Sequence, residues 1–107
     1  MEEVSKGEAL SLASRWEREG QSISVFCFNS PLACSLKSGW IAVCLDGWIE
    51  VRFVEEGMLR IFIAEARFSI ISPEDLPAQS LSLIPNFHHG IRIYFTDDKE
   101  GECYLLA

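Results

Sequence analysis

The sequence predicts a mostly β fold of the α+β class, in which an N-terminal helix precedes a strongly bent antiparallel sheet or small barrel of about seven strands. Three observations support this prediction. Residues 5–19 carry the apolar spacing of a helix, the period changes to two from residue 22, and short turn sequences separate the later runs. A chain of 107 residues with 49% hydrophobic residues is expected to form a single domain over 1–107.

The first expected element is a helix over residues 5–19. Ser5 and Glu8 form an S-x-x-E capping box, in which the serine hydroxyl accepts a hydrogen bond from the Glu8 amide. Gly20 is expected to end the helix in the left-handed conformation. The apolar stripe of this helix recurs at i, i+3, i+4 and i+7, and consists of Ala9, Leu12, Ala13 and Trp16.

Residues 39–53 predict a β-hairpin around Asp46-Gly47, a pair of residues typical of turns that need positive φ. A two-residue loop at this position makes Cys44 face Ile49, and it places the two tryptophans, Trp40 and Trp48, on opposite sides. Glu50 falls on the partly wet face, where a surface substitution has little effect on stability. The expected core face consists of Trp40, Ala42, Cys44, Ile49, Val51 and Phe53.

The remaining strands follow from the same period of two. An antiparallel β meander is expected over 22–71, and its last strands, 58–63 and 67–71, are joined by a tight connection. Residues 72–89 predict an irregular strap or a short helix that starts at Ser72-Pro73. The segment 90–107 predicts a C-terminal hairpin.

The order of a helix followed by five closely spaced strands over residues 5–71 resembles the small bent barrel of Sm-like proteins. The resemblance covers about two thirds of the chain and concerns architecture alone, because Asp46-Gly47-Trp48 stands where that family has the aspartate and asparagine of its RNA-binding loop. No site is carried over from it. A pleckstrin-homology-like barrel is the alternative fold, although its final helix is missing from a chain that ends in Cys-Tyr-Leu-Leu-Ala.

Charge and composition limit the classes of partner. A formal net charge of −7 disfavours binding to nucleic acid and to anionic membranes. The N-terminal residues carry no secretory signal, and no apolar run is long enough to span a bilayer, so we expect a cytoplasmic protein without a membrane partner.

No catalytic motif occurs in the sequence, and we expect neither an enzyme nor a cofactor or metal. His88 and His89 are adjacent, so on an extended chain they point to opposite faces. The four cysteines are expected to be reduced core thiols. Cys27 and Cys34 oppose each other if Ser30-Pro31 is a two-residue loop, and they separate if the turn starts at Pro31.

Four arginines, Arg52, Arg60, Arg67 and Arg92, lie inside expected strands. They can form an anion site on one face of the sheet. They can equally pair with carboxylates across strands, for which Glu50, Glu65 and Glu102 are the candidates, and this second interpretation is favoured.

The sequence therefore predicts a non-catalytic module that acts through protein–protein contacts, either as a homodimer or with another protein. The C-terminal strand carries no residue that repels another strand, so it lies either inside the sheet or against a second chain. One alternative is a small-ligand-binding domain with residues 73–89 as a lid, and the other is an Sm-type nucleic-acid binder. The candidate contacts with a ligand or partner are Trp48, His88, Tyr94 and Leu105.

Overall fold

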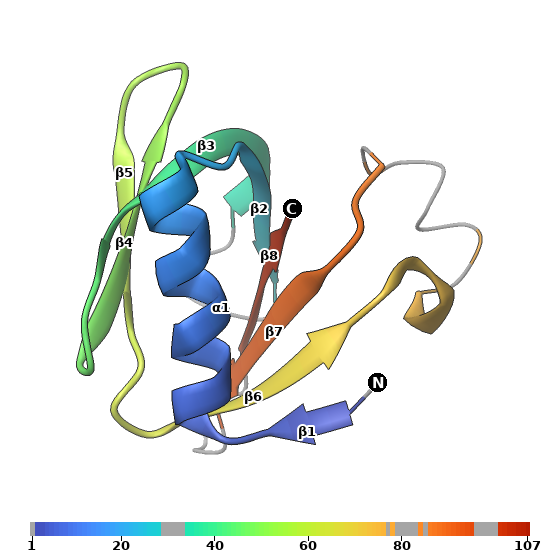
Figure 1. Cartoon of the computed structure of the whole chain (residues 1–107). Coiled ribbons are helices and arrows are strands. Elements are labelled where there is room, and N and C mark those ends of the chain that lie inside the picture. Colours follow the sequence, from blue (N-terminus) through green and yellow to red (C-terminus); the bar gives the residue numbers. More distant parts are fainter. Residues whose placement is uncertain (1, 29–33, 77, 79–83, 85, 96–100) are drawn as a thin grey trace.

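Eight antiparallel strands form one strongly bent sheet that wraps around an α-helix (Figure 1). The computed structural model describes residues 2–28, 34–76, 78, 84, 86–95 and 101–107. The elements in chain order are β1 (Glu2–Val4), α1 (Lys6–Glu19), β2 (Ile23–Phe28), β3 (Cys34–Cys44), β4 (Trp48–Phe53), β5 (Met58–Phe62), β6 (Ala66–Ile71), the 3₁₀ turn η1 (Pro73–Asp75), β7 (Gly90–Phe95) and β8 (Glu102–Leu106).

The strand order is β1-β6-β7-β8-β2-β3-β4-β5, and the sheet does not close into a barrel. The predicted α+β class, with an N-terminal helix and a bent antiparallel sheet, is confirmed. The predicted meander over 22–71 is wrong at its end, because β6 leaves β5 and pairs with β1 and β7. The order of elements along the chain that the Sm-like resemblance implies is present. In the sheet, however, β7 and β8 lie between β6 and β2.

Strand β1 is not predicted by the sequence. Its residues pair with β6, with Glu3 opposite Ser69. Two glutamates in three residues do not suggest a strand. They are tolerated here because β1 is an edge strand whose residues are largely exposed. β1 thus forms one edge of the sheet, and β5 forms the other.

Helix α1 begins and ends where the sequence predicts. Ser5 is the N-cap and accepts a hydrogen bond from the Glu8 amide, and Gly20 adopts the left-handed conformation with φ 62°. The helix lies on the concave, inner face of the sheet (Figure 1). Its buried residues, Ala9, Ala13 and Trp16, pack against the inward side chains of the strands and form the main core.

A second, smaller core lies on the outer face of the sheet. Phe87 packs there against Tyr104 and Leu106 of β8, and the rings of Phe26 and Tyr104 stack at 4.7 Å. Leu76 and Ile84 also contact this cluster. The described residues of the 72–89 segment therefore cover the outer face over β6, β8 and β2.

A β-bulge at Ala42 overturns part of the predicted hairpin register. Cys44 faces Ile49 as expected, but Ile41 then pairs with Val51 and Trp40 with Arg52. One extra residue in β3 exchanges the faces of all residues before it. Ile41 is consequently buried, and Trp40 is exposed on the outer face.

Two further expectations about this hairpin are wrong. Because Trp40 pairs with Arg52, it lies on the same face as Trp48, not on the opposite one. Glu50, which was expected at the surface, is 4% exposed. Of the predicted core face, Ile49, Val51 and Phe53 are buried, whereas Ala42 and Cys44 are half-buried.

The turn with positive φ angles lies between β4 and β5, not between β3 and β4 as predicted. Among the described residues, the only positive-φ positions are Gly20, Glu56 (φ 89°) and Gly57 (φ 100°), so Asp46-Gly47 does not adopt the expected conformation. The Gly47 carbonyl accepts a hydrogen bond from the Ile63 amide, which extends the β4–β5 ladder into this turn.

The C-terminal hairpin of β7 and β8 is confirmed, and β8 lies inside the sheet between β7 and β2. The 3₁₀ turn η1 begins at Pro73 after Ser72, where the sequence predicts the start of a short helix, and the Asp75 carboxylate accepts a hydrogen bond from the Ser72 amide. The expected turns at 29–31 and 97–100 lie outside the described residues, as do 77, 79–83 and 85 of the strap. In the part of the chain that is described, no helix combines the length and apolar character needed to cross a membrane.

Candidate functional site

An apolar surface lies on the outer face of β3, β4 and β5 and on the turns between them. All the large hydrophobic side chains that are exposed in the described residues belong to it, and Phe62 is 65% exposed. We call this the β3–β5 face. Its exposed apolar members are Leu36, Trp40, Leu45, Val54, Met58 and Phe62.

The pairing of the strands explains why these side chains share one face. Directly opposed residues of antiparallel strands point to the same side. Trp40 is opposite Arg52, which is opposite Met58, and Trp48 is opposite Phe62. The inner-facing residues between them are buried against α1, so the apolar surface is additional to the core.

A shallow groove adjoins this face beside the turn between β4 and β5. Leu36 and Val54 contribute apolar walls, while Lys37 and Glu55 contribute charged ones. The backbone of Val54 is fixed by a hydrogen bond from its amide to the Ser38 carbonyl, and its side chain is exposed, with 69% of the residue accessible. The groove therefore extends the β3–β5 face around the end of the sheet.

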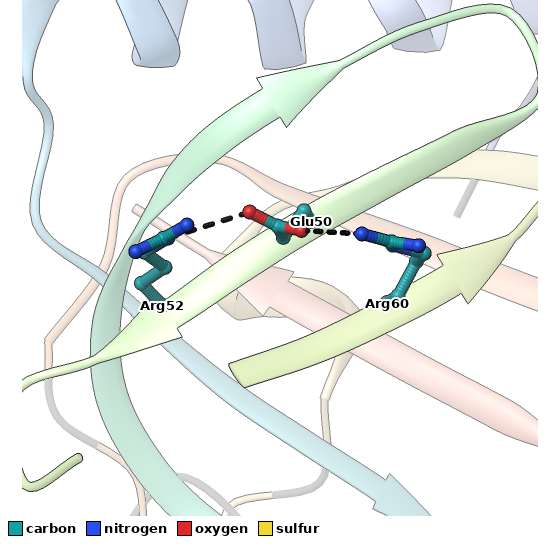
Figure 2. A network of polar contacts seen from close by, with 3 residues as sticks. All are labelled: Glu50, Arg52 and Arg60. Atoms are coloured by element: carbon teal, nitrogen blue, oxygen red, sulfur yellow. Dashed lines mark hydrogen bonds and ion pairs between the residues drawn. The ribbon is translucent and has the colours of Figure 1, made fainter. Parts of the chain in front are cut away.

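Glu50 occupies the middle of the β3–β5 face and binds two arginines (Figure 2). Its carboxylate accepts hydrogen bonds from Arg60 at 3.0 Å and from Arg52 at 3.3 Å. The bond from Arg60 is the main reason that the pKa of Glu50 lies below its ordinary value, and the bond from Arg52 acts in the same direction against desolvation. Since two guanidinium groups share one carboxylate, the cluster carries one net positive charge.

Both arginines of this cluster reach solvent, and Arg60 also contacts an aromatic ring. The Arg60 guanidinium lies 5.3 Å from the centroid of the Trp48 ring, a cation–π geometry. The side chains of Arg52 and Arg60 remain 57% and 44% exposed. The β3–β5 face is thus an apolar and aromatic surface with a small positive centre.

Arg67 and Arg92 form a separate group on β6 and β7. Arg67 pairs with Glu3 of β1 at 2.7 Å, rather than with Glu65, and Arg92 pairs with Glu102 of β8. The hydroxyl of Tyr94 donates to Glu3, and its ring lies 4.3 Å from the Arg92 guanidinium. The four predicted arginines therefore have carboxylate partners and belong to two clusters on opposite halves of the sheet, not to one site.

The four candidate ligand contacts are not brought together. Trp48 lies on the β3–β5 face, and Tyr94 belongs to the Glu3 cluster three strands beyond β3. His88 is exposed, with its backbone amide bonded to the Ala107 carbonyl, and Leu105 is fully buried on the inner face. Only Trp48 of this set contributes to the surface described here.

The free edge of β5 borders the apolar surface. The Phe53 amide donates to the Gly57 carbonyl, and the Ile63 amide donates to the Gly47 carbonyl. Backbone groups alternate in direction along a strand, so the amides and carbonyls of Met58, Arg60 and Phe62 point away from β4. This edge carries neither proline nor lysine, the residues that commonly prevent strand addition.

Parts of this site are predictable from the sequence. Trp48 and the pairing of Arg52 and Arg60 with Glu50 follow from the period of two along the strands. Trp40 and Phe62 were missed. Trp40 depends on the bulge at Ala42, whereas Phe62 could have been found by extending the register of the 40–53 hairpin to the next strand.

Comparisons of the chain with protein-family models, with curated proteins and with solved structures found no significant match.

Proposed function

We propose that this chain is a non-catalytic protein-interaction module that forms a homodimer through the β3–β5 face and the free edge of β5. The observation that carries the proposal is the gathering of exposed apolar side chains on this one surface. A contiguous exposed apolar patch is typical of an interaction site in a folded protein. The described residues of the 72–89 segment cover another part of the outer face, over β6, β8 and β2.

The residue types on the β3–β5 face suit a protein interface. Aromatic residues, methionine and arginine are enriched in the centres of such interfaces. Here Trp40, Met58 and Phe62 surround Arg52 and Arg60. Glu50 holds both guanidinium groups in place, so a partner meets side chains that are already ordered.

A second copy of the chain fits the edge of β5 by antiparallel pairing about a two-fold axis. With Ile61 on the axis, Arg60 of one copy faces Phe62 of the other, and Leu59 faces Ile63. This register avoids a direct pair of like charges and gives each guanidinium an aromatic neighbour. A two-fold arrangement closes after two copies, so it leaves no free β5 edge for further addition.

The experiment is a mass measurement by light scattering at about 100 µM, a concentration at which an interface of micromolar affinity is occupied. The intact protein is expected to have the mass of a dimer. Phe62→Lys is expected to be monomeric, because the new charge lies at the centre of the interface and the residue is not part of the core. Circular dichroism is expected to show the same fold in both proteins.

Ser11→Lys provides the matched control. Ser11 is exposed on α1, away from the β3–β5 face, and the substitution adds the same charge. This variant is expected to remain a dimer. A monomeric mass for the intact protein, or a dimeric mass for Phe62→Lys, would contradict the proposal.

A further inference from the structure

We propose that Cys27 and Cys103 form an intramolecular disulfide bond by exchange with a low-molecular-weight disulfide of the glutathione type. The two cysteines lie side by side in the middle of the sheet, on β2 and β8. The proposal is independent of dimer formation, because both residues are on the inner face and far in the strand order from the edge at β5.

The pairing of β2 with β8 places the two residues directly opposite each other. Their register runs without a shift from Ser24 opposite Leu106 to Phe28 opposite Glu102. Directly opposed residues of antiparallel strands have Cα atoms about 4.5–5.5 Å apart. This separation lies within the range of about 4.4–6.8 Å that a disulfide spans, so the sheet need not move to form the bond.

The side chains are also directed toward each other. Cys27 and Cys103 are 4% and 2% exposed, respectively, and both belong to the core beneath α1. The structure holds both as thiols, with the Sγ atoms in contact at 2.6 Å. Oxidation therefore joins two groups that the fold has already brought together.

The chain has two other cysteines, Cys34 and Cys44. Cys34 of β3 is also the backbone partner of Cys27, so it is the alternative that the test must distinguish. Cys44 lies at the far end of β3, where its Sγ accepts a hydrogen bond from Ser14 of α1. Burial raises the pKa of the Cys44 thiol.

The reaction balances as two exchange steps. The thiolate of one cysteine attacks a sulfur of the small disulfide, which forms a mixed disulfide and releases one small thiolate. The second cysteine thiolate then attacks the protein sulfur of the mixed disulfide and releases the other small thiolate. Two electrons pass from the cysteine pair to the reagent, and each cysteine gives up one proton to solvent.

The bond would connect the two halves of the sheet. β2 continues into β3–β5, whereas β8 is paired with β7 and through it with β6 and β1. A disulfide between β2 and β8 closes a loop from Cys27 to Cys103, and long closed loops restrict the unfolded chain most strongly. The oxidised protein is therefore expected to melt at a higher temperature than the reduced protein.

The test is refolding of the reduced, denatured chain in a buffer of oxidised and reduced glutathione, followed by peptide mass mapping. The expected product has lost two hydrogen atoms and contains a Cys27–Cys103 linked peptide. Its melting temperature is expected to exceed that of the reduced form. Cys44→Ser is the matched control and is expected to give the same linked peptide and the same increase.

Cys103→Ser is expected to lose the increase in melting temperature on oxidation, while its reduced form still folds. Cys34→Ser is expected to retain the Cys27–Cys103 bond. A Cys27–Cys34 peptide as the main product would overturn the proposal. So would a refolded protein in which both Cys27 and Cys103 remain open to alkylation after denaturation.

Discussion

Glu50 is a carboxylate that two arginines keep charged within an apolar surface. At the scale of single residues, such a group decides local stability, because a buried charge is tolerated only when it is paired. Both oxygens of Glu50 are used, one by Arg52 and one by Arg60. The arginines are half-exposed and can be solvated, so the buried carboxylate is the member of the cluster that most depends on its partners.

Glu50→Gln is therefore expected to lower the melting temperature at pH 7 by several degrees, because the two guanidinium groups lose their shared negative partner. Glu55→Gln is the control, since Glu55 is exposed in the turn after β4, and it is expected to melt like the intact protein. Thermal melts followed by circular dichroism measure the difference. Equal melting temperatures for the two variants would show that the cluster does not contribute to stability.

The same pair of proteins has an expected pH dependence. The folded state lowers the pKa of Glu50, so its contribution is complete above the unfolded value of about 4.3. The contribution disappears as the pH falls through the lower, folded pKa. The difference in melting temperature between the intact protein and Glu50→Gln is thus expected to shrink in acid, and melts over a pH series check this.

At the scale of elements, β3 decides the shape of the sheet. It has eleven residues, pairs with β2 through its first part and with β4 through its second, and bends around α1 (Figure 1). Gly39 lies where the two pairings meet, opposite both Ile23 and Phe53. A Cβ atom at Gly39 would stand 2.2 Å from the Arg52 carbonyl oxygen, so the close approach of β3 and β4 requires glycine.

Gly39→Ala is expected to destabilise the protein by about 1–3 kcal/mol, as overpacking against fixed neighbours does. Gly47→Ala is the matched control, because no atom lies within 4 Å of its added Cβ and its φ is not positive. The control is expected to stay within about 0.5 kcal/mol of the parent protein. Urea denaturation measures both changes, and a Gly39→Ala midpoint equal to that of the control would contradict the close approach.

At the scale of the whole molecule, the last strand completes a sheet that begins with β1. β8 pairs with β7 and with β2, and Leu105 and Leu106 are almost completely buried on opposite faces. Leu105 belongs to the core under α1, and Leu106 to the core under the 72–89 segment. The C-terminal strand is therefore not an edge, and the argument for dimer formation belongs to β5 instead.

A chain that ends at Cys103 is expected to be unfolded. Removal of a large buried side chain costs about 2–5 kcal/mol, and this truncation removes Tyr104, Leu105 and Leu106. Their sum reaches the whole stability of a typical domain, about 5–15 kcal/mol. Circular dichroism and thermal melts measure the outcome, and a cooperative melt in the truncated chain would contradict the central position of β8.

The sequence by itself determined the parts of the fold that depend on residues close together in the chain. The capping of α1 by Ser5 and Gly20, the burial of Ala9 and Trp16, and the period of two along each strand are local properties, and all are present in the structure. The pairing of strand arginines with carboxylates was also predictable in part, because Glu50 and Arg60 belong to neighbouring strands.

Only the tertiary structure decided the order of the strands, the faces of β3 and the exposure of the candidate site. β1 reaches β6 and β8 reaches β2 across most of the chain, and no local pattern records such pairings. The bulge at Ala42 exchanges Trp40 and Ile41 between surface and core, since a shift of one residue reverses every side chain in a strand. This exchange places Trp40 opposite Arg52 on the face that also carries Glu50 and Phe62, whereas the period of two alone places Trp40 on the core face.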